Sequence, residues 1–130
     1  MHRDVKPENI MIAGTGEVKL ADLGLAKAVE SDNQVTHFGM VMGTPVYMPP
    51  EQWNDAGNVG PPGDVYSLGA TLYHLLTGRS AIQGKSLQEI GQRVCNEPFP
   101  DVRQALPDLD PGLAEILARA TRLHPAERQR

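Results

Sequence analysis

The pattern of apolar and polar positions divides the chain into a short extended part and a longer helical part. Two apolar runs, residues 10–12 and 18–21, flank a glycine-containing turn at residues 14–16, which is typical of a β-hairpin. From Asp64 onward, apolar residues recur every three or four positions, which is typical of α-helices. The pattern therefore predicts an α+β fold that is mainly helical and carries one small hairpin.

Three longer helices are predicted in the second half of the chain. The first has Asp64 as its N-cap and ends at Gly78, the second runs from the capping box at Ser86 to about Asn96, and the third begins at Asp110. Because Ala70 and Tyr73 make the first helix apolar on most sides, we expect it to be central and buried. The residues predicted to form the buried stripes are, in chain order, Val65, Leu68, Leu72, Leu75, Leu76, Leu87, Ile90, Val94, Leu113, Ile116, Leu117, Ala120 and Leu123.

Composition sets bounds on this picture. With 130 residues, of which 40% are apolar and 22% charged, the chain has the composition of one ordinary globular domain. A net charge of -4 gives no support for a partner such as nucleic acid or an anionic membrane. Cys95 is the single cysteine, which favours a reducing, cytoplasmic location. No apolar run approaches the roughly 20 residues that span a bilayer, so no membrane segment is predicted.

Polar residues cluster just before and just after the predicted hairpin. Asp4, Lys6 and Asn9 precede its first strand, and Asp22 follows its second. Because a hairpin brings its two ends together, we expect these four side chains to converge. Carboxylate and amide oxygens are the ligands that Mg²⁺ prefers, and an ammonium group suits phosphate. The sequence therefore predicts phosphate chemistry at this place.

These clusters resemble two motifs of the eukaryotic-type protein kinases. The catalytic loop of that family is similar to residues 2–9, HRDVKPEN, and its metal-binding Asp-Phe-Gly is similar to residues 22–24, with Leu in place of Phe. Lys-Pro-Glu-Asn at residues 6–9 is the form typical of kinases that act on serine and threonine. The resemblance implies transfer of the γ-phosphate of ATP to protein serine and threonine hydroxyls, with Mg²⁺ or Mn²⁺ as the metal.

The resemblance also implies a role for each of the four polar residues. Asp4 would accept or orient the proton of the substrate hydroxyl, and Lys6 would place its charge on the transferring phosphoryl group. Asn9 and Asp22 would hold the metal and, together with Lys6, bind ATP. The transition state of phosphoryl transfer carries negative charge, so it needs neutralising positive charge more than covalent catalysis.

The family's activation segment would correspond to residues 25–51 and end in the motif of residues 43–51, GTPVYMPPE, with a short helix beginning near Pro50. Thr44 is expected to hydrogen-bond toward Asp4 and Lys6 and to help position the hydroxyl substrate.

A regulatory phosphorylation site is expected within the same segment. Thr36 is the preferred site and Ser31 the other available hydroxyl, and Arg3 and Lys27 match the family positions that would receive the phosphate. The alternative is that Thr36 is an ordinary solvated loop residue.

Two long-range contacts are expected from the resemblance of the helical part, residues 64–130, to the family's large lobe. Asp64 would accept hydrogen bonds from the backbone amides of residues 2 and 3. Arg128 would form an ion pair with Glu51, although His124 stands where an aspartate is usual in the family.

The whole chain would then be a partial kinase domain, in which residues 1–24 carry the catalytic loop and the metal-binding motif. The family's smaller N-terminal lobe, with its glycine-rich loop and strand lysine, is absent from these residues and would be supplied in cis or in trans. The 130 residues alone are therefore expected to transfer no phosphate. Two alternatives remain open, a kinase-like binding module without phosphoryl transfer and a decayed fragment with no stable fold.

Overall fold

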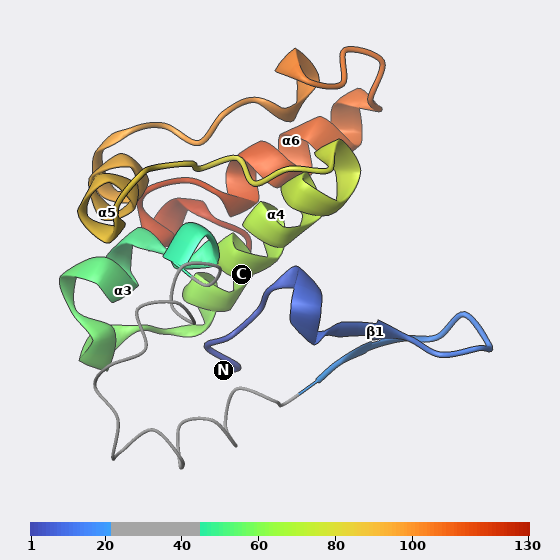
Figure 1. Ribbon diagram of the computed structural model, residues 1–130, viewed down its shortest axis with the longest axis horizontal. Coiled ribbons are helices and arrows are strands. Elements are labelled where there is room, and N and C mark those ends of the chain that lie inside the picture. The colour runs from blue at the N-terminus through green and yellow to red at the C-terminus, as the bar shows by residue number, and fades with distance from the viewer. Residues whose placement is uncertain (22–44) are drawn as a thin grey trace.

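The structure is a computed structural model that describes residues 1–21 and 45–130 of the chain (Figure 1). It contains α-helices, short 3₁₀ helices and one antiparallel sheet. The described elements are, in chain order, η1 (Pro7–Asn9), β1 (Ile10–Ile12), β2 (Val18–Leu20), η3 (Pro45–Tyr47), α3 (Pro50–Asn54), η4 (Ala56–Asn58), α4 (Pro61–Thr77), α5 (Leu87–Asn96), η5 (Val102–Gln104), α6 (Pro111–Ala120) and η6 (Pro125–Glu127). The predicted fold class, mainly helical with a small hairpin, is confirmed.

The predicted hairpin is present, with β1 and β2 antiparallel and Ile12 paired with Val18. Its turn needs a glycine, because Gly16 has a φ of 86°, in the left-handed region. The hairpin projects away from the helices, and Met11, Ile12 and Val18 are 58%, 73% and 66% exposed (Figure 1). A two-stranded ribbon with so little buried surface is at best marginally stable by itself.

Helix α4 is the central element of the helical part, and it contacts η1, η3, α6 and η6 (Figure 1). It begins at Pro61, with Gly60 as its N-cap, so the prediction that Asp64 is the N-cap was wrong. Pro61 and Pro62 suit a first turn, because the backbone N–H that proline lacks has no partner within the helix there. Asp64 therefore lies at the end of the first turn, inside the helix.

The buried face of α4 differs from the predicted leucine stripe. Leu68 and Leu75 are 54% and 55% exposed, and Leu87 of α5 and Ile116 of α6 are exposed as well. Ala70 and Tyr73 are buried as expected. The residues that α4 buries are small or aromatic, namely Gly63, Tyr66, Ser67, Gly69, Ala70, Thr71 and Tyr73.

Close contact between helices explains this difference. A Cβ atom on Gly69 would lie 2.8 Å from Cγ2 of Thr121 and 3.0 Å from Cβ of Ala120, just after and at the end of α6. A leucine cannot occupy such a position, so the face that touches α6 carries small side chains. The regularly spaced Leu68 and Leu75 therefore lie on a different face of α4 from the one that packs against α6.

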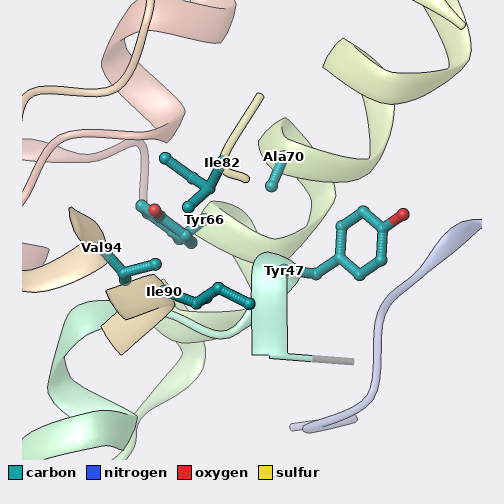
Figure 2. Packing of buried hydrophobic residues seen from close by; sticks show 6 residues of the cluster. All are labelled: Tyr47, Tyr66, Ala70, Ile82, Ile90 and Val94. Atoms are coloured by element: carbon teal, nitrogen blue, oxygen red, sulfur yellow. The ribbon is translucent and has the colours of Figure 1, made fainter. Parts of the chain in front are cut away.

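Two hydrophobic clusters form the core along α4. The first consists of Tyr47, Tyr66, Ala70, Ile82, Ile90 and Val94 (Figure 2). The second consists of Tyr73, Val102, Ala114 and Leu117. Phe99 packs against both clusters, and its ring makes edge-to-face contacts with Tyr66 and Tyr73 at centroid distances of 5.9 and 5.5 Å. This one aromatic side chain joins the two halves of the core.

The predicted starts of α5 and α6 are confirmed by their capping bonds. Ser86 Oγ accepts the amide of Glu89 at 3.1 Å, and Asp110 Oδ2 accepts the amide of Leu113 at 2.9 Å. In the usual capping box the Glu89 carboxylate would accept a hydrogen bond from the amide of the cap residue, Ser86. Here it accepts one from the amide of Lys85. No helix in the described part of the chain is both long and apolar enough to cross a bilayer.

We expect Gly69→Val to destabilise the protein by about 1 to 3 kcal/mol, because the added side chain overpacks the contact between α4 and α6. Urea unfolding measures this loss. The matched control is Ala118→Val, at an exposed position of α6, where valine should cost only its lower helix propensity, below about 0.7 kcal/mol. Equal losses for the two variants would show that the contact at Gly69 is not tight.

Candidate active site

The loop before η1 is held in an unusual backbone conformation by one carboxylate. Arg3 has a φ of 66° and is the one non-glycine residue with positive φ in the described part of the chain. Asp64 Oδ2 accepts the amide of His2 at 2.7 Å, and its Oδ1 accepts the amide of Arg3 at 2.9 Å. Because one carboxylate receives two successive amides, it fixes the peptide on both sides of His2. The expected contact of Asp64 is therefore present.

A second contact with α4 holds the other end of the same loop. The hydroxyl of Thr71 donates to the carbonyl of Val5 at 3.5 Å. Asp64 and Thr71 are seven positions apart, about two helical turns, and so lie on one face of α4. This face of α4 is the platform that supports the loop.

The side chain of His2 joins the loop to the end of the hairpin. Its Nδ1 lies 3.3 Å from the amide of Asp4, and its Nε2 lies 2.9 Å from the carbonyl oxygen of Ala21. An amide can only donate, so Nδ1 is the acceptor, and Nε2 then carries the proton that is donated to Ala21. The imidazole therefore brings residue 21, the neighbour of Asp22, next to the loop.

Asp4, Lys6 and Asn9 converge as expected. The Asn9 amide nitrogen donates to the backbone oxygen of Asp4 at 2.8 Å and to its Oδ2 at 3.0 Å. The ammonium of Lys6 lies 3.4 Å from Asp4 Oδ1. Asn9 is only 3% exposed, whereas the side chains of Asp4 and Lys6 are 21% and 16% exposed. The carboxylate of Asp4 and the ammonium of Lys6 are thus partly exposed to solvent, whereas Asn9, which bonds to Asp4, is buried.

The donor set of this cluster fits a hard cation such as Mg²⁺. Both N–H bonds of the Asn9 amide are engaged by Asp4, so its oxygen remains as an acceptor beside a carboxylate. The backbone oxygen of Asn9 accepts a hydrogen bond from the amide of Ala21 at 2.7 Å. This bond holds the residue that precedes Asp22 close to Asn9. Residues 1–21 and 45–130 contain no group of three His, Cys, Asp or Glu side chains that could hold a metal, and Asp22 lies outside these residues.

The Arg128 guanidinium forms the expected ion pair with Glu51 and is almost fully buried, at 1% exposure. Its Nη1 and Nη2 lie 2.7 and 2.9 Å from the two carboxylate oxygens of Glu51. The remaining donors reach the backbone oxygens of Pro62, Arg122 and Leu123 at 2.9, 2.8 and 3.0 Å. All five N–H donors of the guanidinium therefore have an acceptor, which a buried cation requires.

An aromatic ring covers the same guanidinium. The carbon Cζ of Arg128 lies 5.0 Å from the centroid of the Tyr66 ring, within cation–π range. Burial raises the pKa of the Tyr66 hydroxyl well above its ordinary value, and the positive charge of Arg128 opposes that shift. The ion pair thus belongs to the core and joins α3, the start of α4 and the segment after α6.

Comparison with known proteins shows to which family the chain belongs. The family model of the protein kinase domain matches residues 1–129. The chain belongs to the protein kinase domain family. It is 42% identical over 128 residues to the serine/threonine-protein kinase PknL of Mycobacterium tuberculosis and 42% identical over 132 residues to PknA of the same species, matches that cover 98% and 100% of this chain. It is also 40% identical over 132 residues to PknK of Mycobacterium bovis, again over 98% of the chain.

The chain spans less than a third of the length of these curated relatives. It covers 32% of PknL, 29% of PknA and 11% of PknK. The mainly helical structure with one small hairpin is consistent with the larger, helical lobe of a kinase domain.

The structure places only some of the expected site residues. Asp4, Lys6 and Asn9 lie together, Asp64 braces their loop, and Glu51 pairs with Arg128. Arg3 is described and exposed. Asp22, Lys27, Thr36 and Thr44 lie outside the described residues.

The sequence indicates a packed His2 with a hydrogen-bonded ring, which is confirmed, but it did not show that the ring bonds to the amide of Asp4 and the carbonyl of Ala21. It also missed the support that Thr71 gives to the carbonyl of Val5. The motif of residues 2–9 includes His2, but a backbone acceptor such as the carbonyl of Ala21 has no signature in the sequence.

We expect Arg128→Met to destabilise the protein by about 3 to 5 kcal/mol, because it leaves the Glu51 carboxylate without its partner and three backbone oxygens without a donor. Thermal and urea unfolding measure the loss. Arg119→Met, at an exposed position of α6, is the matched control and should be nearly neutral. If neither Arg128→Met nor Glu51→Gln changed the thermal midpoint, the pair would contribute nothing to stability.

We expect Asp64→Ala to cost about 1 to 3 kcal/mol, because the amides of His2 and Arg3 lose their acceptor. Hydrogen exchange should show the same loss locally, as faster exchange of the Arg3 amide. Asp64→Asn, which keeps one oxygen acceptor, should give an intermediate result, and Asp108→Ala, at an exposed loop position, should change neither quantity. Unchanged exchange at Arg3 in Asp64→Ala would contradict the bracing role.

Proposed function

We propose that this chain is the catalytic segment of a serine/threonine protein kinase and transfers the γ-phosphate of ATP to serine and threonine hydroxyls of protein substrates. The observation that carries the proposal is the convergence of Asp4, Lys6 and Asn9 on a loop braced by α4. Its relatives PknL and PknA are named serine/threonine-protein kinases, which supports the same class of reaction.

In this proposal each side chain has one task. The Asp4 carboxylate orients the substrate hydroxyl and takes its proton while the hydroxyl oxygen bonds to the γ-phosphorus and the bond to ADP breaks. Lys6, whose ammonium lies beside that carboxylate, neutralises charge on the transferring phosphoryl group. Asn9 and Asp22 would hold Mg²⁺ or Mn²⁺, which supplies further neutralising charge on the phosphate oxygens of ATP.

The residues outside the described part have proposed roles that rest on the motifs alone. Thr44 positions the hydroxyl substrate against Asp4. Thr36 is the proposed regulatory phosphorylation site, and Arg3 and Lys27 receive its phosphate. The exposed position of Arg3 is compatible with such a contact.

We also propose that an N-terminal kinase lobe, in cis or in trans, completes the active site. The hairpin and α4 leave large apolar side chains in solvent, and a covering lobe would bury surface of this kind. These side chains are Met11, Ile12, Val18, Leu20, Leu68 and Leu75. That lobe would also supply the glycine-rich loop over the phosphates of ATP.

We propose that the chain has three functional parts. Residues 1–24 carry the catalytic loop and the metal-binding motif, residues 25–51 form the activation segment, and residues 64–130 form the helical subdomain. A cytoplasmic location is favoured by the single cysteine, Cys95, and the net charge of -4 does not favour nucleic acid as a partner.

The second candidate is a kinase-like binding module without phosphoryl transfer. The exposed apolar surface of the hairpin is the observation that favours it, because such a surface can bind a partner without any catalysis. The two candidates differ in whether the carboxylate of Asp4 is needed.

A chimera that places the whole part of the PknL kinase domain that precedes the matched segment, N-terminal lobe included, before residues 1–130 tests the function. Transfer of labelled phosphate from Mg-ATP to serine- and threonine-containing peptides is measured for the chimera and for the isolated chain. We expect turnover by the chimera and none by the isolated chain. Asp4→Asn in the chimera should lower kcat by at least about 10²-fold, whereas Asp108→Asn, at an exposed loop position, should have no effect.

Two results would contradict the proposal. A folded but inactive chimera, or one whose activity survives Asp4→Asn, would favour the binding module. Turnover by the isolated chain would instead show that no second lobe is required.

A further inference from the structure

A cavity of about 340 Å³ lies beside α6, and none of Asp4, Lys6 and Asn9 lines it. Its walls come from α6, from residues 98–102 after α5 and from the segment after α6, and one residue of α4 also contributes. Pockets that hold small molecules have volumes of roughly 300–1,000 Å³. The cavity is therefore large enough for a compact organic ligand.

The inner wall of the cavity is apolar and partly aromatic. Tyr73, Val102 and Leu117 line it, and all three are buried members of the second core cluster. Phe99 lines it together with the two prolines that flank it in the sequence. Aromatic rings pack against other flat rings in offset or edge-to-face geometry. The inner wall therefore favours a flat aromatic group.

An exposed cation stands at the rim of the cavity. Arg122 lines the cavity, and its guanidinium forms no hydrogen bond or ion pair within residues 1–21 and 45–130. His124, which is exposed as well, lines the same rim. A carboxylate can accept two parallel hydrogen bonds from a guanidinium. The rim therefore offers a place for the anionic group of a ligand whose apolar part fills the cavity.

Two acidic side chains also line the cavity, and they limit where the anionic group can lie. The Asp101 carboxylate is already paired with Arg103, since its Oδ2 lies 3.2 Å from Nη2 and its Oδ1 accepts the Arg103 amide at 2.9 Å. Glu127 has no cationic partner in the part of the chain that the structure describes. An anionic group is thus attracted by Arg122 and repelled by Glu127, so it should lie nearest to Arg122.

The same wall is connected to the buried guanidinium of Arg128. Arg122 and Leu123 line the cavity, and their backbone oxygens accept hydrogen bonds from Arg128 at 2.8 and 3.0 Å. Phe99 also packs edge-to-face on Tyr66, the ring that covers the guanidinium. A ligand that contacts Phe99 and Arg122 would therefore touch two of the groups that hold Arg128 in place.

We propose that this cavity binds a small aromatic carboxylate, whose ring packs against Tyr73 and Phe99 and whose carboxylate pairs with Arg122. Burial of the ring supplies affinity, and the charge-assisted hydrogen bonds fix the orientation of the ligand. The bound molecule joins the segment after α5 to the segment after α6. It thereby holds the turn whose carbonyl groups bind Arg128, and it stabilises the ion pair.

Titration of the 130-residue chain with cinnamate, followed by NMR, tests the site. Cinnamate is a flat aromatic carboxylate, and we expect it to bind saturably with a Kd below about 1 mM. The largest shifts should fall on the amides of residues 99–102 and 117–124. Cinnamyl alcohol, which is neutral, and cinnamylamine, which is cationic, should bind at least about fivefold more weakly, because neither can pair with Arg122.

Four variants at exposed positions separate the contacts. Arg122→Gln should weaken the binding of cinnamate about fivefold, and Glu127→Gln should strengthen it about twofold, because a repelling charge is removed. Ala118→Leu places a larger side chain in the wall of the cavity and should abolish binding. Arg119→Gln, on α6 but outside the cavity, is the matched control and should leave Kd unchanged. The NMR spectra of the variants also check that each one is folded.

Exchange of the Nε proton of Arg128 tests the effect on the ion pair. Arg128 is 1% exposed and donates this proton to the backbone oxygen of Arg122 at 2.8 Å, so exchange requires a local opening. Because that opening would disrupt the wall of the cavity, cinnamate at about ten times its Kd should slow the exchange about tenfold. The amide of Gly16, which donates to the carbonyl of Ala13 in the hairpin, is the control and should exchange at an unchanged rate.

Four results would overturn the proposal. The first is the absence of saturable binding, or a Kd that neither Arg122→Gln nor Ala118→Leu changes. The second is tighter binding of cinnamylamine than of cinnamate, which would show that the cavity takes a cation through Glu127. The third is unchanged exchange at Arg128 in the saturated protein. The fourth is loss of binding in the PknL chimera, which would show that the preceding part of the kinase domain fills the cavity. None of these measurements involves phosphoryl transfer, so they leave the proposed function untouched.

Discussion

The arrangement of the candidate active site depends on one carboxylate in the first turn of α4. Asp64 accepts two successive backbone amides, and this keeps Arg3 in a left-handed conformation that a non-glycine residue adopts only at a cost. A charged acceptor makes stronger hydrogen bonds than a neutral one. A negative charge near a helix N-terminus is also favourable. The same side chain therefore stabilises the start of α4 and orders the loop that carries Asp4.

A second constraint meets the first at the same turn of α4. Arg128 donates to the carbonyl of Pro62, two residues before Asp64, and to both oxygens of Glu51 in α3. A buried guanidinium is tolerated because all of its donors have acceptors. The start of α4 is thus held from one side by the loop that carries Asp4 and from the other by the ion pair. We therefore expect a change at either contact to alter the geometry of the other.

Much of the secondary structure was predictable from local signals. Ser86 and Asp110 cap α5 and α6 as expected, because a capping side chain bonds an amide only three residues away. The start of α4 at Pro61 and its buried face were not predictable. Two prolines and a glycine are typical of a turn as well as of a first helical turn. The spacing of leucines indicates an apolar face, but it does not say which neighbouring helix packs there or how closely.

The sequence by itself determined the kinds of element, the chemical groups of the candidate site and, through its motifs, the pairings of Asp64 with the amides of His2 and Arg3 and of Glu51 with Arg128. The tertiary structure alone decided the left-handed backbone at Arg3, the orientation of the Asn9 amide toward Asp4 and the cavity beside α6. The reason is physical. These features depend on the distance and direction between groups on different elements, and often on backbone atoms that every residue shares, so no residue type marks them along the chain.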